Sequence, residues 1–103
     1  EKSMKERLNV AVVGATGMVG RKMLQVLQER NFPIENLYLF ATAKSAGNKL
    51  AYGDKKYTVE ELTENSFDRG IDIALFSAGA STSLKFAPIA ASKGTIVIDN
   101  SSA

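Results

Sequence analysis

The chain contains no cysteine and no histidine. Without cysteine it can form no disulfide and offers no thiolate nucleophile, and without histidine it offers no imidazole base. Typical zinc sites, which rely on these two residue types, are excluded as well. We therefore expect any nucleophile or base of these kinds to lie outside the 103 residues.

Long hydrophobic runs and clustered charge are also missing. The apolar run Val10–Val13 is far too short for a signal-peptide core, and no run is long enough to cross a bilayer. The net charge is only +2, and the lysines are spread along the chain apart from pairs such as Lys55-Lys56. This pattern lacks the clustered positive charge of nucleic-acid-binding proteins. We expect a cytoplasmic protein without nucleic-acid or membrane partners.

The remaining composition is that of one small globular domain, with 45% hydrophobic residues. Apolar runs alternate with a segment of helical periodicity, in which Val19, Met23, Val26 and Leu27 are expected to face the core. Core strands are predicted at residues 8–13, 36–41, 72–76 and 95–99. Helices are predicted at residues 18–30 and 84–93, a β-hairpin at 49–59, a short helix or irregular link at 60–67, and a loop at 77–83.

This alternation predicts an α/β fold, a Rossmann-like parallel sheet with flanking helices. Residues 1–7 are interpreted as a leader, with Met4 as a candidate natural start and Glu1-Lys2-Ser3 left over from cloning. Residues 8–103 are interpreted as a dinucleotide-binding domain. Because a full dinucleotide-binding fold usually has six strands, we expect this one to be most of such a fold, incomplete at its C-terminal end.

Three glycines follow the first predicted strand and open the first helix, at Gly14, Gly17 and Gly20. A strand, a glycine-rich turn and a helix form the usual layout of a dinucleotide phosphate site, although the first gap here is one residue longer than in G-x-G-x-x-G. Gly14 would allow the sharp turn, Gly17 the approach of a pyrophosphate, and Gly20 close packing of the helix against the sheet. The first N–H groups of the helix would face the anion.

Four segments rich in small and polar residues follow predicted strands. In parallel sheets, ligands bind beyond the carboxyl ends of the strands. These segments are Gly14–Gly20, Thr42–Ser45, Ser77–Ser83 and Asn100–Ser102. Each alone is also compatible with an ordinary turn, but together on one edge they predict a binding site.

The segment after the second strand indicates which dinucleotide binds. NAD-binding proteins place an acidic residue there for the ribose 2′-hydroxyl, but no acid occurs between Glu35 and Asp54. Lys44, flanked by Thr42 and Ser45, instead suits a 2′-phosphate. The sequence therefore favours NADP, with a solvated loop lysine as the alternative interpretation of Lys44.

As a set, the motifs resemble those of bacterial aspartate-semialdehyde dehydrogenases, and the resemblance covers nearly all of residues 8–103. It is carried by residues 12–20 (VVGATGMVG), 31–33 (NFP), 44–47 (KSAG), 74–79 (ALFSAG), 81–83 (STS) and 98–102 (IDNSS). The resemblance implies the amino-terminal NADP-binding domain of an enzyme that reduces aspartyl phosphate to aspartate semialdehyde with NADPH. That reaction lies on the route to lysine, threonine and methionine.

The resemblance also implies roles for individual residues, all of them in cofactor binding. The family commonly has arginine where this chain has Lys44, so bidentate binding of the 2′-phosphate is lost. The catalytic cysteine, histidine and substrate-binding arginines of the family have no counterpart here, so no catalytic residue is assigned and the chain alone should be inactive. The implied cofactor-binding residues are Gly14, Thr16, Gly17, Met18, Val19, Gly20, Thr42, Lys44, Ser45, Ser77, Ala78, Gly79 and Asn100.

Two alternatives remain at this point. One is the domain of an N-acetyl-glutamyl-phosphate reductase, which shares the reaction type, although the run from Ser77 to Ser83 argues against it. The other is a noncatalytic NADP-binding module. For the parent enzyme we expect a homo-oligomer whose small-molecule substrate is bound mainly by residues outside this chain.

Overall fold

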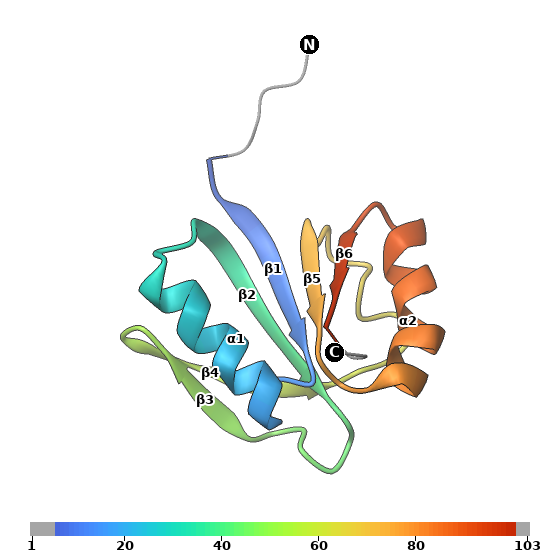
Figure 1. Ribbon diagram of the computed structural model, residues 1–103, viewed down its shortest axis with the longest axis horizontal. Helices are drawn as coiled ribbons and strands as arrows, with labels where there is room; N and C mark the ends of the chain where they lie inside the picture. Colours follow the sequence, from blue (N-terminus) through green and yellow to red (C-terminus); the bar gives the residue numbers. More distant parts are fainter. Residues whose placement is uncertain (1–5, 101–103) are drawn as a thin grey trace.

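The computed structural model describes residues 6–100, which form a single six-stranded sheet with two helices (Figure 1). The strand order is β3-β4-β2-β1-β5-β6. The elements are, in chain order, β1 (Leu8–Val13), α1 (Met18–Glu29), β2 (Ile34–Ala41), β3 (Lys49–Tyr52), β4 (Lys55–Glu61), β5 (Ile73–Phe76), α2 (Ala80–Ser92) and β6 (Ile96–Asp99).

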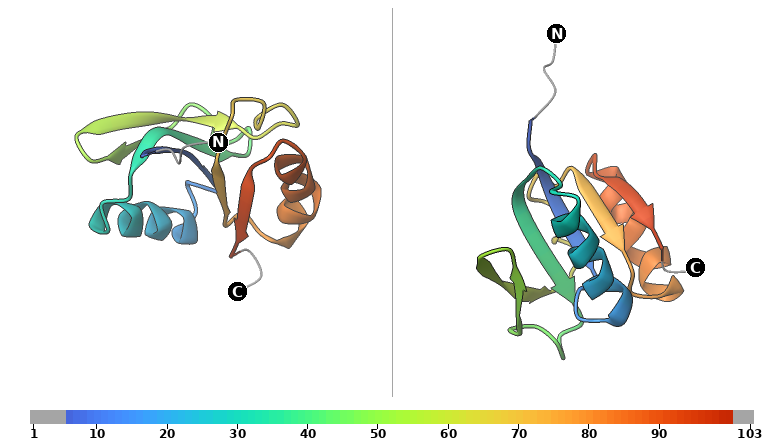
Figure 2. Two further views of the ribbon diagram at one scale, coloured as in Figure 1. Left: turned by 90° about the horizontal axis from the view of Figure 1, so that it is seen from above. Right: turned by 60° about the vertical axis from the view of Figure 1, so that its left-hand side comes forward.

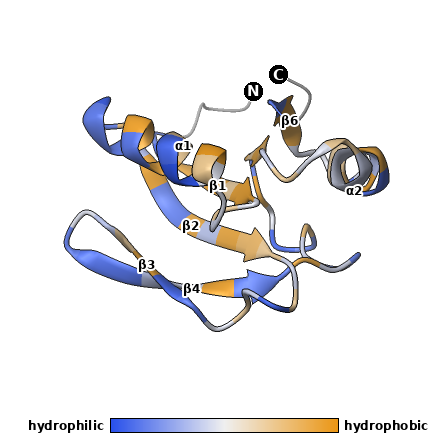
Figure 3. Ribbon diagram, turned by 60° about the horizontal axis from the view of Figure 1, so that its bottom comes forward, coloured by the Kyte–Doolittle hydropathy of each residue, from blue (hydrophilic) through white to orange (hydrophobic). Residues whose placement is uncertain are grey.

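The sheet is Rossmann-like, as predicted, but it is mixed rather than wholly parallel. The pairs β1–β2, β1–β5, β2–β4 and β5–β6 are parallel. Only β3 runs antiparallel, because the tight turn at Gly53-Asp54 folds it back onto β4 as a hairpin. The hairpin lies at the hydrophilic margin of the sheet, whereas β2 becomes hydrophobic towards its carboxyl end (Figure 3).

Strand β1 lies in the middle of the sheet and is buried on both faces. Val10 and Val12 face a core closed by Leu24 of α1. Ala11 and Val13 face a second core, closed by Ala90 of α2 and by the segment between β4 and β5. The two helices thus cover different faces of the twisted sheet (Figure 2), which explains why β1 reads as a continuous apolar run.

The direction in which successive strands are added to the sheet reverses between β1 and β5. From β1 the chain passes through α1 to β2 on one side, whereas from β5 it passes through α2 to β6 on the other side. Val13 pairs with both Phe40 and Phe76, and Phe76 pairs with Asp99. The strand ends are therefore level at one edge, which confirms that the described residues of the polar segments after them share that edge. Such a reversal point is where open α/β sheets bind ligands.

Helix α2 begins earlier than predicted. It starts at Ala80 after Gly79, which adopts a φ of 106°. The predicted loop over 77–83 is therefore wrong in its second half, because the hydroxyl-rich residues Ser81 to Ser83 form the first turn of the helix. Their low intrinsic helix preference is outweighed by tertiary contacts, since Ser83 is buried and its Oγ donates a hydrogen bond to Asp99 Oδ1 at 3.1 Å.

The predicted apolar face of α1 was also partly wrong. Val19 and Val26 are exposed, at 48% and 37%, and the residues that α1 buries are Gly20 and Leu24. Helical periodicity alone did not show how closely Gly20 brings the helix onto the loop before it. The link from residue 62 to residue 72 is a series of turns and not a helix. Within residues 6–100, neither helix is long and apolar enough to cross a membrane.

Candidate functional site

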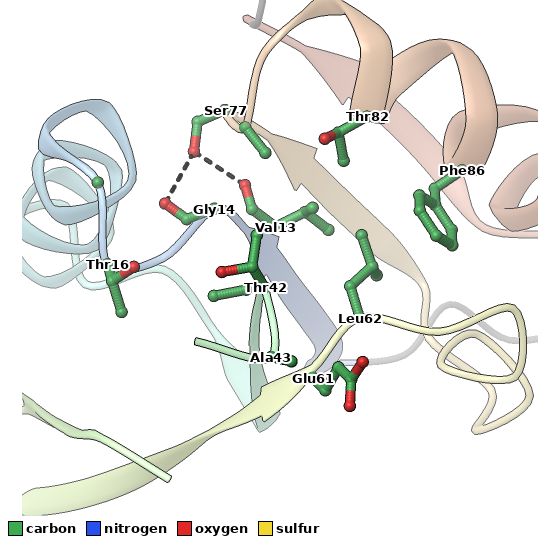
Figure 4. Close-up of a pocket in the computed structure, with 13 residues that line it drawn as sticks. Val13, Gly14, Thr16, Thr42, Ala43, Glu61, Leu62, Ser77, Thr82 and Phe86 are labelled. Atoms are coloured by element: carbon green, nitrogen blue, oxygen red, sulfur yellow. Dashed lines mark hydrogen bonds between the residues drawn. The ribbon is translucent and has the colours of Figure 1, made fainter. Parts of the chain in front are cut away.

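A pocket of about 490 Å³ opens at the reversal point, between the ends of β1, β2, β4 and β5 and the start of α2 (Figure 4). It joins three of the four segments that the sequence predicted to form a site. Its lining residues are Val13, Gly14, Thr16, Gly17, Ala41, Thr42, Ala43, Glu61, Leu62, Ser77, Ala78, Thr82 and Phe86.

Gly14 and Gly20 are required by the packing of the chain itself. Gly14 has a φ of +86°, and a Cβ there would lie 2.9 Å from the backbone and Cβ of Ala78. A Cβ on Gly20 would lie 2.1 Å from the carbonyl oxygen of Gly14. The sharp turn at Gly14 is therefore confirmed as predicted, whereas the close packing of the helix at Gly20 is against the Gly14–Ala15 backbone that follows β1 and not against the sheet.

Gly17 differs from these two glycines. Its φ of −78° and ψ of 172° suit any residue, and an added Cβ would meet only the Gly14 carbonyl oxygen, at an ordinary 3.5 Å. Gly17 is exposed, lines the pocket and caps α1 without any capping side chain. The first turn of α1 also contains no acidic residue. Its N–H groups lack carbonyl partners within the helix and are thus suited to an anion.

The turn after β2 lies beside the glycine loop. Ser45 N donates to the carbonyl oxygen of Thr42 at 2.9 Å, which closes the turn. Thr16 Oγ1 donates to Ser45 Oγ at 3.3 Å, so a hydroxyl pair connects the two segments. Lys44 is exposed on this turn. A phosphate bound between these segments would meet one cation and several hydroxyl groups.

The end of β5 is tied to the end of β1 by Ser77. Its backbone N–H donates to the carbonyl oxygen of Val13 at 2.9 Å, and its Oγ donates to the same oxygen at 2.9 Å (Figure 4). The Ser77 hydroxyl therefore uses its proton within the protein and keeps its acceptor capacity for a ligand. Gly79 then caps α2, so a second helix begins at the pocket.

The far side of the pocket was not predicted from the sequence. Leu62 and Phe86 form an apolar wall, with Glu61 beside them. Strand β4 was expected to end at Val59, whereas it extends to Glu61, which brings Glu61 and Leu62 level with the end of β2. Phe86 lies on α2, and its position depends on how that helix packs. No local sequence signal could have identified it.

Glu60, next to Glu61, is held outside the pocket by Arg69. The Arg69 guanidinium donates to both carboxylate oxygens of Glu60, at 2.9 Å and 2.6 Å, and lies 5.1 Å from the centre of the Tyr38 ring. The hydrogen bond from Arg69 lowers the pKa of Glu60 below its ordinary value, against a smaller opposing effect of burial. The pair fixes the link after β4 to the sheet.

The structure brings together six of the thirteen predicted cofactor-binding residues in the pocket lining: Gly14, Thr16, Gly17, Thr42, Ser77 and Ala78. Three more belong to the start of α1, where Met18 and Val19 are exposed and Gly20 is buried. Lys44, Ser45 and Gly79 adjoin the lining. Asn100 follows β6, and its N–H donates to the carbonyl oxygen of Phe76 at 2.9 Å. Ser101 and Ser102, from the fourth predicted segment, fall outside the described residues.

Comparison with known proteins supports the same interpretation. Residues 9–103 match the family model "Semialdehyde dehydrogenase, NAD binding domain". The chain is 60% identical over 95 residues to an aspartate-semialdehyde dehydrogenase of Aquifex aeolicus, covering 91% of this chain and 28% of that protein. The crystal structure of aspartate semialdehyde dehydrogenase II from Vibrio cholerae, complexed with ASA, superposes with a TM-score of 0.87 at 48% identity and covers 91% of this chain and 30% of that one.

A more distant structure shares the fold. Aspartate semialdehyde dehydrogenase from Candida albicans, determined with NADP, gives a TM-score of 0.76 at 21% identity, over 92% of this chain and 30% of that one. The chain thus spans less than a third of the length of these relatives. The relatives carry the name aspartate-semialdehyde dehydrogenase, so the alternative of an N-acetyl-glutamyl-phosphate reductase is not favoured.

Proposed function

Because the chain belongs to the semialdehyde dehydrogenase family, as its NAD-binding domain, we propose that it is the NADP-binding part of an aspartate-semialdehyde dehydrogenase. The whole enzyme would reduce aspartyl phosphate to aspartate semialdehyde, on the route to lysine, threonine and methionine. The 60% identity to the Aquifex aeolicus protein supports this assignment. Cytoplasmic location and a homo-oligomeric parent stay predictions.

The observation that carries the proposal is the geometry around Gly17. The protein's own packing leaves room for a side chain there, yet the residue is glycine, exposed at the pocket and at the start of α1. A pyrophosphate bound at this position would receive hydrogen bonds from the first N–H groups of α1 and would be stabilised by the helix dipole. The absence of a side chain lets the anion reach those groups.

The preference for NADP rests on the turn after β2. Lys44 offers a positive charge, and Thr42 and Ser45 offer hydroxyl groups, in the segment where an NAD-binding protein has an acid. A single charge-assisted hydrogen bond to the 2′-phosphate contributes about 1.5–3 kcal/mol. The lysine ammonium is a point charge and cannot bind phosphate through two parallel hydrogen bonds as the arginine guanidinium can. The preference for NADP over NAD should therefore be smaller than with arginine.

When bound, the dinucleotide supplies the hydride for reduction at the acyl carbon. The residues of this chain would bind and orient it, with the pyrophosphate at Gly17 and the adenosine in the pocket that Thr42, Ser77 and the end of β4 line. The chain contains no cysteine or histidine, so the nucleophile and the proton-transfer group would come from the rest of the longer protein.

A chimeric enzyme tests the proposal. Residues 8–100 would replace the matching segment of the Aquifex aeolicus relative, and NADP reduction would be followed with aspartate semialdehyde and phosphate. We expect the chimera to be active and Gly17→Val in the chimera to abolish the activity. The isolated chain should be inactive.

Two results would contradict the proposal. A folded chimera without activity would favour a noncatalytic nucleotide-binding module. Turnover by the isolated chain above a protein-free control would show that the catalytic groups had been misassigned.

A further inference from the structure

Glu61 carries the only charge among the described residues that line the pocket. It lies at the carboxyl end of β4, where it pairs in register with Ala41 at the end of β2. The following N–H, of Leu62, donates to the carbonyl oxygen of Ala41 at 2.8 Å, which fixes the backbone at this point. Figure 4 shows Glu61 next to Ala43 and Leu62. The backbone of Glu61 is thus fixed at the end of β4, where its side chain lines the pocket.

The neighbouring carboxylate shows what is unusual about Glu61. Glu60 is occupied by two hydrogen bonds from Arg69. Within residues 6–100, the carboxylate of Glu61 makes no hydrogen bond or ion pair. Side chains alternate along a strand, so the two carboxylates point to opposite faces of β4. One is used by the protein, and the other is free to accept a hydrogen bond from a ligand.

The strand order indicates which part of the dinucleotide Glu61 would meet. In the proposed binding mode, the pyrophosphate lies at the end of β1, and the ribose with its 2′-phosphate lies at the end of β2. The next strand in that direction is β4, so the base comes last. Leu62 and Phe86 offer apolar surfaces to a flat ring, and an ionised carboxylate only accepts hydrogen bonds. A base with an amino group at its edge suits this combination.

We infer that Glu61 selects adenine by accepting a hydrogen bond from its exocyclic amino group. This inference rests on the proposed function, because it assumes that a nicotinamide dinucleotide binds with its pyrophosphate at Gly17. Glu61 is then a specificity-determining residue that does not touch the reacting atoms. A base with a carbonyl oxygen in place of the amino group would bring one acceptor against another, because neither that oxygen nor the Glu61 carboxylate carries a proton to donate.

The test compares NADP with its hypoxanthine analogue, in which a carbonyl replaces the amino group. Dissociation constants are measured by calorimetry for the wild-type chain, Glu61→Gln and the control Glu60→Gln, after circular dichroism has shown that each is folded. We expect the wild type to bind NADP about tenfold more tightly than the analogue, as for loss of a hydrogen bond to a charged group. Glu61→Gln should abolish the preference, because an amide can accept from the amino group and donate to the carbonyl. Glu60→Gln should keep it.

The outcomes separate this inference from the proposed function. Equal binding of both dinucleotides by the wild type, or an unchanged preference in Glu61→Gln, would overturn the inference and leave the proposed function intact. A gain in NADP affinity in Glu61→Gln, with base preference unchanged, would also overturn it, since the carboxylate would then act on the 2′-phosphate. Binding of neither dinucleotide would overturn the proposed function and the inference together.

Discussion

The loop after β1 and the turn after β2 form adjacent walls of the same pocket, but they are held in different ways. The loop from Gly14 to Gly20 is fixed by contacts so close that a Cβ on Gly14 or Gly20 would overlap neighbouring atoms. The turn from Thr42 to Gly47 is mostly exposed and is closed by its own backbone hydrogen bonds. The first therefore leaves little freedom in sequence, whereas side chains on the second can change without disturbing the core.

This difference suggests a division of roles. The tightly packed loop places the start of α1 at the pocket, where we propose that the pyrophosphate binds. If the proposed function holds, the exposed turn would determine which dinucleotide binds, because it would only present side chains to the ribose. Substitutions in the two segments should therefore affect different measurements. Those in the loop should change stability or the overall affinity for dinucleotides, and those in the turn should change the choice of dinucleotide.

The largest effect is expected from Gly20→Ala. The new Cβ would lie 2.1 Å from the Gly14 carbonyl oxygen and 2.8 Å from Ala15 Cα, so the helix must move away. We expect the free energy of unfolding to fall by about 3 kcal/mol, as for a severe case of overpacking. Urea denaturation measures it. Gly17→Ala is the matched control and should lose less than about 1 kcal/mol; equal losses in both variants would contradict the packing argument.

Gly17→Val should separate binding from folding. The side chain has room in the protein but occupies the path of the pyrophosphate to the first turn of α1. We expect the affinity for NADP to fall about a hundredfold, because charge-assisted hydrogen bonds are lost. Calorimetry gives the affinity, and circular dichroism should show an unchanged fold. Unaltered affinity would mean that the loop is only a structural turn.

Lys44→Asp should change the choice of dinucleotide and leave stability unchanged. An acid at this position repels a 2′-phosphate and can accept a hydrogen bond from a 2′-hydroxyl. We expect NADP to bind about tenfold more weakly than to the wild type, with NAD binding the same or better. Parallel titrations with both dinucleotides measure the change. If the wild type binds the two equally, Lys44 is a solvated lysine without a role in selection.

The smallest effect is expected from Ser45→Ala. It removes the 3.3 Å hydroxyl contact with Thr16 that connects the two segments. Because the pair is only partly buried, we expect a loss of about 0.5 kcal/mol in NADP binding. Thr42→Val serves as a comparison at a hydroxyl that lines the pocket directly. A loss for Ser45→Ala as large as for Gly17→Val would show that the turn, and not the loop, holds the pyrophosphate.

The same division explains how much could be predicted from the sequence. The glycine loop was predicted in position and in the role of Gly14, because strong steric requirements leave a recognisable spacing. The carboxyl ends of β1, β2, β5 and β6 were also predicted, because these parallel strands read as apolar runs, whereas the end of β4 was not. The fold class therefore followed from local patterns that agree with the tertiary structure.

The wrong predictions lie where tertiary contacts outweigh local preference. The start of α2 was placed at Leu84, because the residues from Ser81 to Ser83 are poor helix formers, yet contacts such as that of Ser83 with Asp99 hold them in the helix. Glu61 and Phe86 were missed as pocket residues because only the pairing of β4 with β2 and the packing of α2 bring them to the site. Neither contact leaves a local signal.

The most direct test of the account is a nuclear magnetic resonance titration of the isotope-labelled chain with NADP. We expect the backbone amide signals of Gly17, Met18 and Ala78 to shift in a saturable manner, because these residues would surround the bound pyrophosphate and ribose. The amide signals of the hairpin turn at Gly53 and Asp54, which precedes β4 at the end away from the pocket, should not shift. Saturable shifts at the hairpin with none at Gly17, or no saturable shifts at all in the folded chain, would contradict the account.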